Sequence, residues 1–221
     1  MANVLTSPTF FAIVIGTVPS ILWLWFWRRL DKTGDEPFGL LTLCFILGGV
    51  SVFLATFLQG IAKDMVSNPN ARIVIWAGIE ELLKFGIFYL VAYKSAYDDE
   101  ALDPAMYLIV VALGFAALEN IFYIIKPGAS FNITASLLTG TFRFFGSTLL
   151  HTIASCFIGI MITLSPKKVR GIGMLLGIGG AIFLHTTFNF FILKNDTASF
   201  LQIYGYLWVT AIISHVILEK L

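Results

Sequence analysis

The sequence predicts an all-α, polytopic membrane protein in which about seven transmembrane helices form a bundle around a polar cavity in the outer half of the bilayer. Its composition is the first reason: of the 221 residues, 58% are hydrophobic and 12% are charged, and soluble domains have about 25% charged residues. The second is that the apolar residues gather in stretches of helical length. The third is that ionisable side chains recur in the middle of four of these stretches.

The composition also excludes several classes of protein. So few charges could not cover the surface of a cytosolic enzyme, a nucleic-acid-binding domain or a disordered linker. The net charge of +1 gives a nucleic-acid partner no electrostatic support. Cys44 and Cys156 lie within apolar runs, and we interpret them as free thiols between helices. No repeat or soluble segment interrupts the pattern, so we expect one integral membrane domain over residues 1–221.

Each apolar stretch is long enough to cross a bilayer core of about 30 Å, which takes roughly 20 helical residues. Lipid offers the backbone no hydrogen bonds, so segments of this length are predicted to be helices. Turn-forming residues, among them Pro37, Pro69, Pro104 and Pro166, separate the stretches. The predicted spans are 8–28, 38–62, 72–94, 104–125, 141–164, 170–193 and 198–217.

Basic residues are unequally divided between the two sides of such a bundle. The side that holds the C-terminus and the loops around 28–37, 95–103 and 165–169 carries eight lysines and arginines, against four on the other side. The positive-inside rule therefore predicts an outside N-terminus and a cytoplasmic C-terminus. The first span ends in residues typical of an interfacial anchor, namely Trp23, Trp25, Trp27, Arg28 and Arg29.

Ionisable residues inside the spans are the strongest functional signal. They are Glu80, Glu81 and Lys84 in the third span, Glu119 in the fourth, His151 in the fifth and His185 in the sixth. Such groups cost several kcal/mol at membrane depth, so they face the bundle interior and mark function; interhelical polar contacts are the structural alternative. At 1.5 Å per residue the glutamates and histidines lie about 9–15 Å below the outer surface, in one layer that indicates a site.

Helical spacing suggests how these groups divide the chemistry. Glu80 and Lys84 are i,i+4 neighbours, so we expect Lys84 to pair with Glu80 while Glu81 points elsewhere. A carboxylate in this layer can act as a general base on water. His185 and Asn189 are also i,i+4 neighbours, and an imidazole and a carboxamide can both donate to a developing oxyanion.

Two further polar residues are less informative. Asn120 directly follows Glu119 and is expected to orient a neighbour. Arg143 shares a helical stripe with Ser147 and His151, and we interpret it as reaching the outer headgroups. A substrate-binding role for Arg143 is the alternative.

Four short elements on four successive spans together resemble a known family. Residues 80–84 form an EExxK element, residues 114–120 a GFAxxEN element, and residues 185–189 an HxxxN element, with His151 on the span between the last two. In this order they resemble the PrsW family of intramembrane proteases, which is related to the type II CAAX prenyl endopeptidases and to bacteriocin-processing membrane proteins. The resemblance covers about residues 72–193, the expected catalytic core.

The resemblance implies a peptide hydrolase of a prokaryotic cell membrane whose substrate is itself membrane-anchored, such as a single-pass anti-sigma factor. It implies that the paired glutamates activate water with His151 as a partner, and that His185 and Asn189 form an oxyanion site. The prenyl endopeptidases have FxxxH where this chain has Phe115 and Glu119, which weakens the case for a prenylated substrate. The candidate catalytic residues are Glu80, Glu81, Lys84, Glu119, Asn120, His151, His185 and Asn189.

Metal dependence stays open at this point. A zinc site in the His₂Glu manner would take Glu119, His151 and His185 as ligands, with Glu80 or Glu81 as the base. A metal-free mechanism needs only the glutamate, the histidine and hydrogen-bond donors. Because Lys84 already supplies a positive charge beside the glutamates, we favour the metal-free mechanism.

Two other classes of protein fit part of the pattern. A proton-coupled transporter or channel would use a Glu, His and Lys cluster as a relay, but the chain shows no inverted repeat and its polar groups lie in one layer. A catalytically inert scaffold or immunity protein is a third interpretation, and the complete motifs argue against it. The pattern does not indicate the substrate or the oligomeric state.

Overall fold

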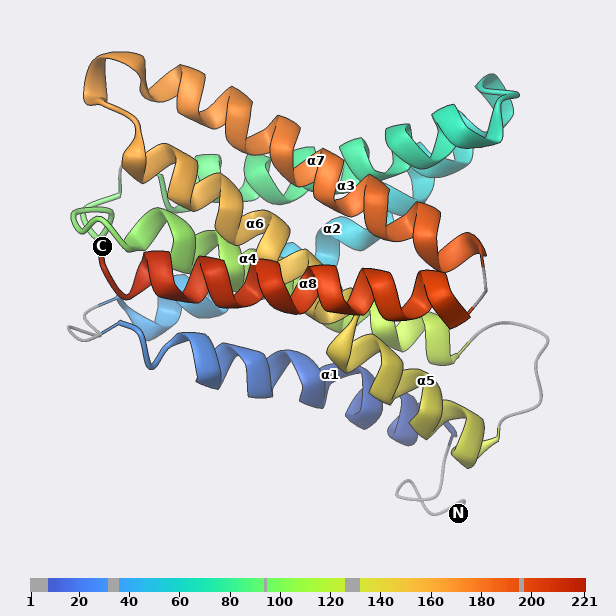
Figure 1. The fold of residues 1–221 in the computed structure, drawn as a ribbon. Helices are drawn as coiled ribbons and strands as arrows, with labels where there is room; N and C mark the ends of the chain where they lie inside the picture. The colour runs from blue at the N-terminus through green and yellow to red at the C-terminus, as the bar shows by residue number, and fades with distance from the viewer. Residues whose placement is uncertain (1–7, 32–35, 94, 126–131, 195–196) are drawn as a thin grey trace.

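The computed structural model describes residues 8–31, 36–93, 95–125, 132–194 and 197–221. Within these ranges all regular secondary structure is helical and there is no strand (Figure 1), so the predicted fold class is confirmed. Lys32, Lys94 and Lys126, which contributed to the predicted orientation, lie outside the described residues.

The described residues form eight α-helices and one short 3-10 helix. The α-helices are α1 (Pro8–Trp27), α2 (Phe38–Met65), α3 (Pro69–Val91), α4 (Asp103–Ile124), α5 (Ile133–Phe145), α6 (Ser147–Leu164), α7 (Arg170–Lys194) and α8 (Thr197–Leu218). The 3-10 helix, η2 (Lys167–Val169), leads into α7. Because α1 begins and α8 ends at opposite ends of the bundle (Figure 1), the chain traverses the bundle an odd number of times, as the seven predicted spans require.

Six segments of the described chain are long and apolar enough to cross a membrane. They are α1, α2, α4, the stretch Ile133–Leu164 that joins α5 and α6, the stretch Lys167–Leu193, and Leu201–Leu218 of α8. The third predicted span, α3, has 23 residues but is not among the six. It carries Arg72, Glu80, Glu81 and Lys84, and it packs between α2 and α7 with the last three of these side chains buried.

Helix α4 is the centre of the bundle and contacts α1, α2, α3, α5 and α6. Every residue from Asp103 to Ala117 is buried, as expected for a helix that is apolar on all sides. Glycines allow α2 to approach it closely: a Cβ at Gly48 would overlap the backbone of Val111, and a Cβ at Gly114 would overlap the carbonyl oxygen of Phe45.

The fifth predicted span differs from the structure at its start. The helix begins at Ile133 rather than near residue 141, because the Asn132 side chain accepts a hydrogen bond from the Ala135 N–H at 3.0 Å and caps α5. It then breaks at Gly146, where the backbone angles leave the helical range (φ −115°, ψ −87°). The Tyr204 hydroxyl donates to the Phe142 carbonyl at 2.9 Å beside this break. The break separates α5 from α6 and directs the last turn of α5 toward the polar layer.

Candidate active site

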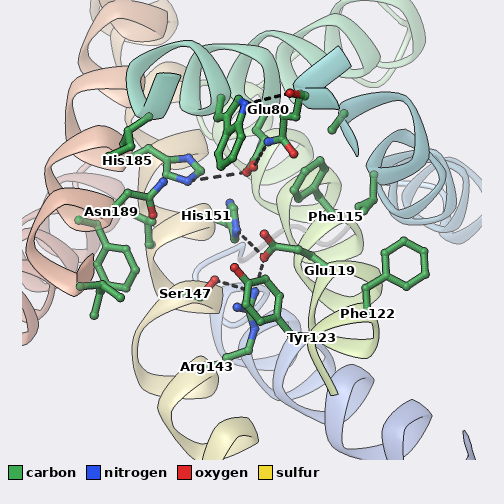
Figure 2. A pocket seen from close by; sticks show the side chains of 18 of the residues that line it. Glu80, Phe115, Glu119, Phe122, Tyr123, Arg143, Ser147, His151, His185 and Asn189 are labelled. Carbon is green, nitrogen blue, oxygen red and sulfur yellow. Dashed lines mark hydrogen bonds and ion pairs between the residues drawn. The ribbon is translucent and has the colours of Figure 1, made fainter. Parts of the chain in front are cut away.

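A pocket of about 590 Å³ lies among α2, α3, α4, α7 and the α5–α6 junction (Figure 2). It reaches from His151 in the first half of α6 to Ile73, Tyr123 and Leu193 near the ends of α3, α4 and α7. Of the predicted site residues, those that line the pocket are Glu80, Glu119, His151, His185 and Asn189. Glu81, Lys84 and Asn120 are buried behind its wall.

The acidic pair of α3 is arranged differently from the expectation. Lys84 Nζ pairs with Glu81 Oε1 at 2.7 Å, and both side chains are fully buried. The expected pairing of Lys84 with Glu80 is therefore wrong, and Glu81 does not point away from the site. The reason lies on α7, because the same Glu81 oxygen is 2.7 Å from Nδ1 of His185 and is thereby drawn toward the bundle interior.

This contact determines which tautomer the neutral His185 ring adopts. A carboxylate only accepts hydrogen bonds, so the Nδ1–H of His185 donates a hydrogen bond to Glu81. In the neutral ring Nε2 then carries a lone pair. Glu80 Oε2 lies 3.7 Å from that Nε2 and has no hydrogen-bond partner in the described part of the chain. Two electron-pair donors thus face each other across a gap that is too long for a hydrogen bond.

The ring of His151 connects the two halves of the site. Its Nδ1 lies 3.1 Å from Lys84 Nζ, and its Nε2 lies 3.2 Å from Glu119 Oε2. An ammonium group only donates hydrogen bonds, so Nδ1 accepts one from Lys84, and the Nε2–H donates one to Glu119. The ring also packs against that of Phe115, with a centroid separation of 5.4 Å.

Arg143, in the last turn of α5, is part of the site. Its guanidinium forms an ion pair with Glu119 and donates to the Asn120 side-chain oxygen. It also donates to Ser147 Oγ at 3.0 Å and stacks over the Tyr123 ring at 3.9 Å (Figure 2). The interpretation of Arg143 as a residue that reaches the headgroups is therefore wrong. Asn120 does orient a neighbour, and that neighbour is Arg143.

Sequence reasoning missed Gln59 on α2. Its Nε2 donates to Glu80 Oε1 at 2.7 Å, and its backbone carbonyl accepts from Trp76 Nε1 at 3.1 Å. Gln59 thus holds one Glu80 oxygen from the side of the pocket opposite α7 and leaves the other oxygen facing His185. The signal in the sequence was an uncharged amide inside an otherwise apolar run, which stands out less than an ionisable side chain does.

These contacts connect polar side chains of six helices, α2 to α7, into one network, as the predicted single layer requires. The network runs from Gln59 through Glu80, His185, Glu81, Lys84, His151 and Glu119 to Arg143. Its three carboxylates face only two permanent cations. With neutral imidazoles one negative charge is left uncompensated, which favours a further bound cation or proton.

Three of these residues form a group that fits a metal ion. The ligand atoms of Glu80, His151 and His185 lie within 4.8 Å of one another, and one carboxylate with two imidazoles is the donor set of many catalytic zinc sites. The group differs from the expected one because Glu80 takes the place of Glu119, which is paired with Arg143. Glu80 Oε2 and His185 Nε2 are free to bind, whereas His151 must give up one of its two contacts.

Comparison with known proteins agrees with this geometry. Residues 36–217 match the model of a family described as PrsW family intramembrane metalloprotease. A protein named Protease PrsW from Bacillus subtilis (strain 168) is 29% identical over 204 residues, which is 90% of this chain and 91% of that protein. The Protease PrsW of Geobacillus kaustophilus (strain HTA426) is 32% identical over 132 residues, 58% of this chain and 59% of that protein. No solved structure matches the chain.

The family description bears on two of the expectations. It includes a metal, which favours the metal-dependent mechanism over the metal-free one that the sequence favoured. Candidate membrane helices and bacterial relatives together indicate a membrane protein of a prokaryote with a protein substrate in the membrane. The resemblance seen in the four motifs is confirmed over most of the chain, which belongs to the PrsW family of intramembrane proteases and is thus a peptide hydrolase.

Proposed function

We propose that the chain is an endopeptidase that hydrolyses a peptide bond of a membrane-anchored protein, such as a single-pass anti-sigma factor, on the outer side of the membrane. Residues 1–221 act as one membrane domain, and residues 72–193 supply most of the catalytic core. One observation carries the proposal: the unpartnered Oε2 of Glu80 faces Nε2 of His185 at 3.7 Å on the wall of the pocket.

Glu80, His151 and His185 would hold a zinc ion. When bound, zinc supplies a Lewis acid that polarises the scissile carbonyl and makes water more acidic. Glu81 accepts the Nδ1 proton of His185 and so presents Nε2 to the pocket, the usual arrangement behind a metal-binding imidazole. Gln59 likewise orients Glu80: it donates a hydrogen bond to Oε1 and leaves Oε2 facing the pocket.

Asn189 and Glu119 act on the substrate itself. Asn189 lies one turn after His185 and lines the pocket, where its side-chain N–H donates to the oxyanion that forms at the attacked carbonyl. His185 contributes little there because its Nδ1–H already donates a hydrogen bond to Glu81. Glu119 uses Oε2 for Arg143 and His151. Its other oxygen, Oε1, takes the proton from the attacking water and returns it to the leaving amine.

The test measures the metal content and the peptide cleavage rate of the same protein preparation in mild detergent. We expect one zinc per chain by mass spectrometry and cleavage of a fluorogenic transmembrane peptide that stops on chelation and returns with zinc. Glu80→Gln and His185→Ala should lower the cleavage rate at least about a hundredfold and lower zinc occupancy. Glu219→Gln is the matched control, because Glu219 is 57% exposed and lies outside the pocket.

The outcomes separate the metal from the reaction. In one outcome, the zinc-free enzyme cleaves the peptide in the presence of chelator and loses this activity in Glu80→Gln. That result would exclude a metal from the mechanism and make Glu80 the general base. Undiminished cleavage in both Glu80→Gln and His185→Ala would contradict the proposed site as a whole.

A further inference from the structure

A second cavity, of about 490 Å³, lies among α1, α8 and the α5–α6 junction. Its walls are aromatic and apolar, and among the described residues that line it His215 alone is ionisable. The main wall residues are Trp23, Trp25, Trp27, Phe145, Trp208 and His215. From Trp208 in the middle of α8 to His215 in its last turn the cavity extends about 10 Å along the helix axis, at 1.5 Å per residue.

The cavity lies at a surface that is apolar and exposed in the described chain. Trp25 is 56% exposed and Ile212 is 59% exposed, and both line the cavity. In a bilayer this surface faces lipid tails, and the cavity runs parallel to the helices from the end of α1 toward the middle of the membrane. An acyl chain has the width, direction and apolar character that such a cavity accepts.

A basic side chain, that of Arg29, lies beside the interfacial end of the cavity. The Arg29 guanidinium stacks on the Trp25 ring at 3.7 Å and forms no ion pair with a carboxylate of the described residues. Its neighbour Arg28, by contrast, lies 3.9 Å from Asp31 and 3.7 Å from Glu36. An uncompensated arginine over an interfacial tryptophan is complementary to a phosphate at the headgroup level.

We propose that this cavity binds one anionic phospholipid of the leaflet in which α1 ends, with an acyl chain among the tryptophans and the phosphate at Arg29. The lipid lies against the wall that holds the α5–α6 junction. Trp23 Nε1 donates to the Phe144 carbonyl at 3.1 Å, and the Trp23 and Phe144 rings stack at 5.5 Å. Bound lipid is therefore expected to raise the thermal stability of the purified protein.

The experiment titrates delipidated full-length protein in mild detergent with phosphatidylglycerol or phosphatidylcholine that carries brominated acyl chains. Four of the five tryptophans line the cavity, so binding quenches tryptophan fluorescence. We expect quenching to saturate at one lipid per chain, a preference of about fivefold for phosphatidylglycerol, and a Tm that rises with occupancy.

Variants then distinguish lipid binding in the cavity from lipid contact with the rest of the apolar surface. Ala211→Phe fills the cavity from a position that is 7% exposed and should weaken binding at least about tenfold. Arg29→Gln should remove the preference for phosphatidylglycerol while the acyl chain still binds. Leu175→Phe is the matched control, because Leu175 is 72% exposed on α7 and lies outside the cavity. Gel filtration and Tm establish that each variant is folded.

Two results would overturn the proposal. Quenching that does not saturate, is equal for the two lipids and is unchanged in Ala211→Phe and Arg29→Gln would mean that only bulk lipid contacts this surface. A dimer that Ala211→Phe converts to a monomer would mean that a second copy of the chain covers the cavity.

Discussion

Two buried regions of the bundle are held together by different forces. One is the contact between α2 and α4, and the other is the polar layer that α3, α4, α6 and α7 form. Between α2 and α4, Gly48 and Gly114 bring two backbones together and no charge takes part. In the polar layer, Lys84 and Glu81 are fully buried and lie 2.7 Å apart. Close packing stabilises the first region, whereas the second depends on ion pairs between buried charges, such as that of Lys84 with Glu81.

This difference indicates what each region is for. Apolar packing of α2 on α4 would suffice to hold a bundle, and a buried ion pair is often no more stable than an apolar pair of similar volume. The polar layer is therefore best explained by chemistry. Four changes test this comparison. The first three are given in order of decreasing expected effect, and the fourth concerns a buried carboxyl group whose effect depends on pH.

Loss of a single charge in the polar layer should have the largest effect. Lys84→Met leaves Glu81 buried without its cation and should lower the free energy of unfolding by about 3–5 kcal/mol. The double variant Glu81→Met with Lys84→Met should recover most of that stability and show no cleavage. Denaturant unfolding in detergent measures the first effect and the peptide assay the second. A single variant as stable as the parent would show that the buried pair is not needed for folding.

Added volume between α2 and α4 should have the next largest effect. Gly114→Ala forces a Cβ onto the Phe45 carbonyl and should lower the free energy of unfolding by about 1–3 kcal/mol. The control is Gly60→Ala, also a glycine-to-alanine change in a helix but with no atom within 4 Å of the new Cβ. It should raise stability by up to about 1 kcal/mol. Thermal unfolding of the two variants in one detergent decides whether close packing holds this contact, and equal shifts would contradict it.

Loss of the hydrogen bond from Gln59 should affect the reaction more than the fold. Gln59→Leu releases Glu80 Oε1, so we expect kcat to fall about tenfold, about 1.4 kcal/mol in activation free energy, with KM nearly unchanged. Thr56→Val is the control, because Thr56 lines the same pocket but bonds to the Val52 carbonyl at 2.8 Å. Equal losses in the two variants would make Gln59 a general packing residue.

An effect that depends on pH is expected at Glu36, which lies between α1 and α2. Burial, followed by a hydrogen bond with Asp31, raises the pKa of Glu36 from 4.5 to about 7. The folded chain then holds a proton that the unfolded chain releases. The stability from this group is therefore complete below about pH 4.5 and is lost as the pH rises through about 7.

Glu36→Gln keeps a neutral side chain and should remove this part of the pH dependence. Its Tm should exceed that of the parent at pH 8 and match it near pH 4.5. Glu219→Gln, at an exposed position, should leave the difference between the two pH values unchanged. A parent protein whose Tm is the same at both pH values would contradict the assignment.

Much of the site could be predicted because membrane burial constrains sequence so strongly. Glu80, Glu119, His151 and His185 stood out as ionisable groups in apolar runs, and helical rise alone placed them in one layer. The partners of these groups could not be predicted in the same way. Lys84 lies within reach of Glu80 and of Glu81 along the helix, and His185 on α7 decides between them through Glu81.

The sequence by itself determined that the chain is helical, that it is long and apolar enough to cross a membrane repeatedly, and that polar groups of four spans share one depth. These properties follow from hydrophobicity and helical rise, which are local. Only the tertiary structure decided how each helix is rotated about its axis, because that depends on which surfaces pack closely, as at Gly48 and Gly114. Rotation brings Gln59 and Arg143 into the site, and no pattern within a single helix specifies it.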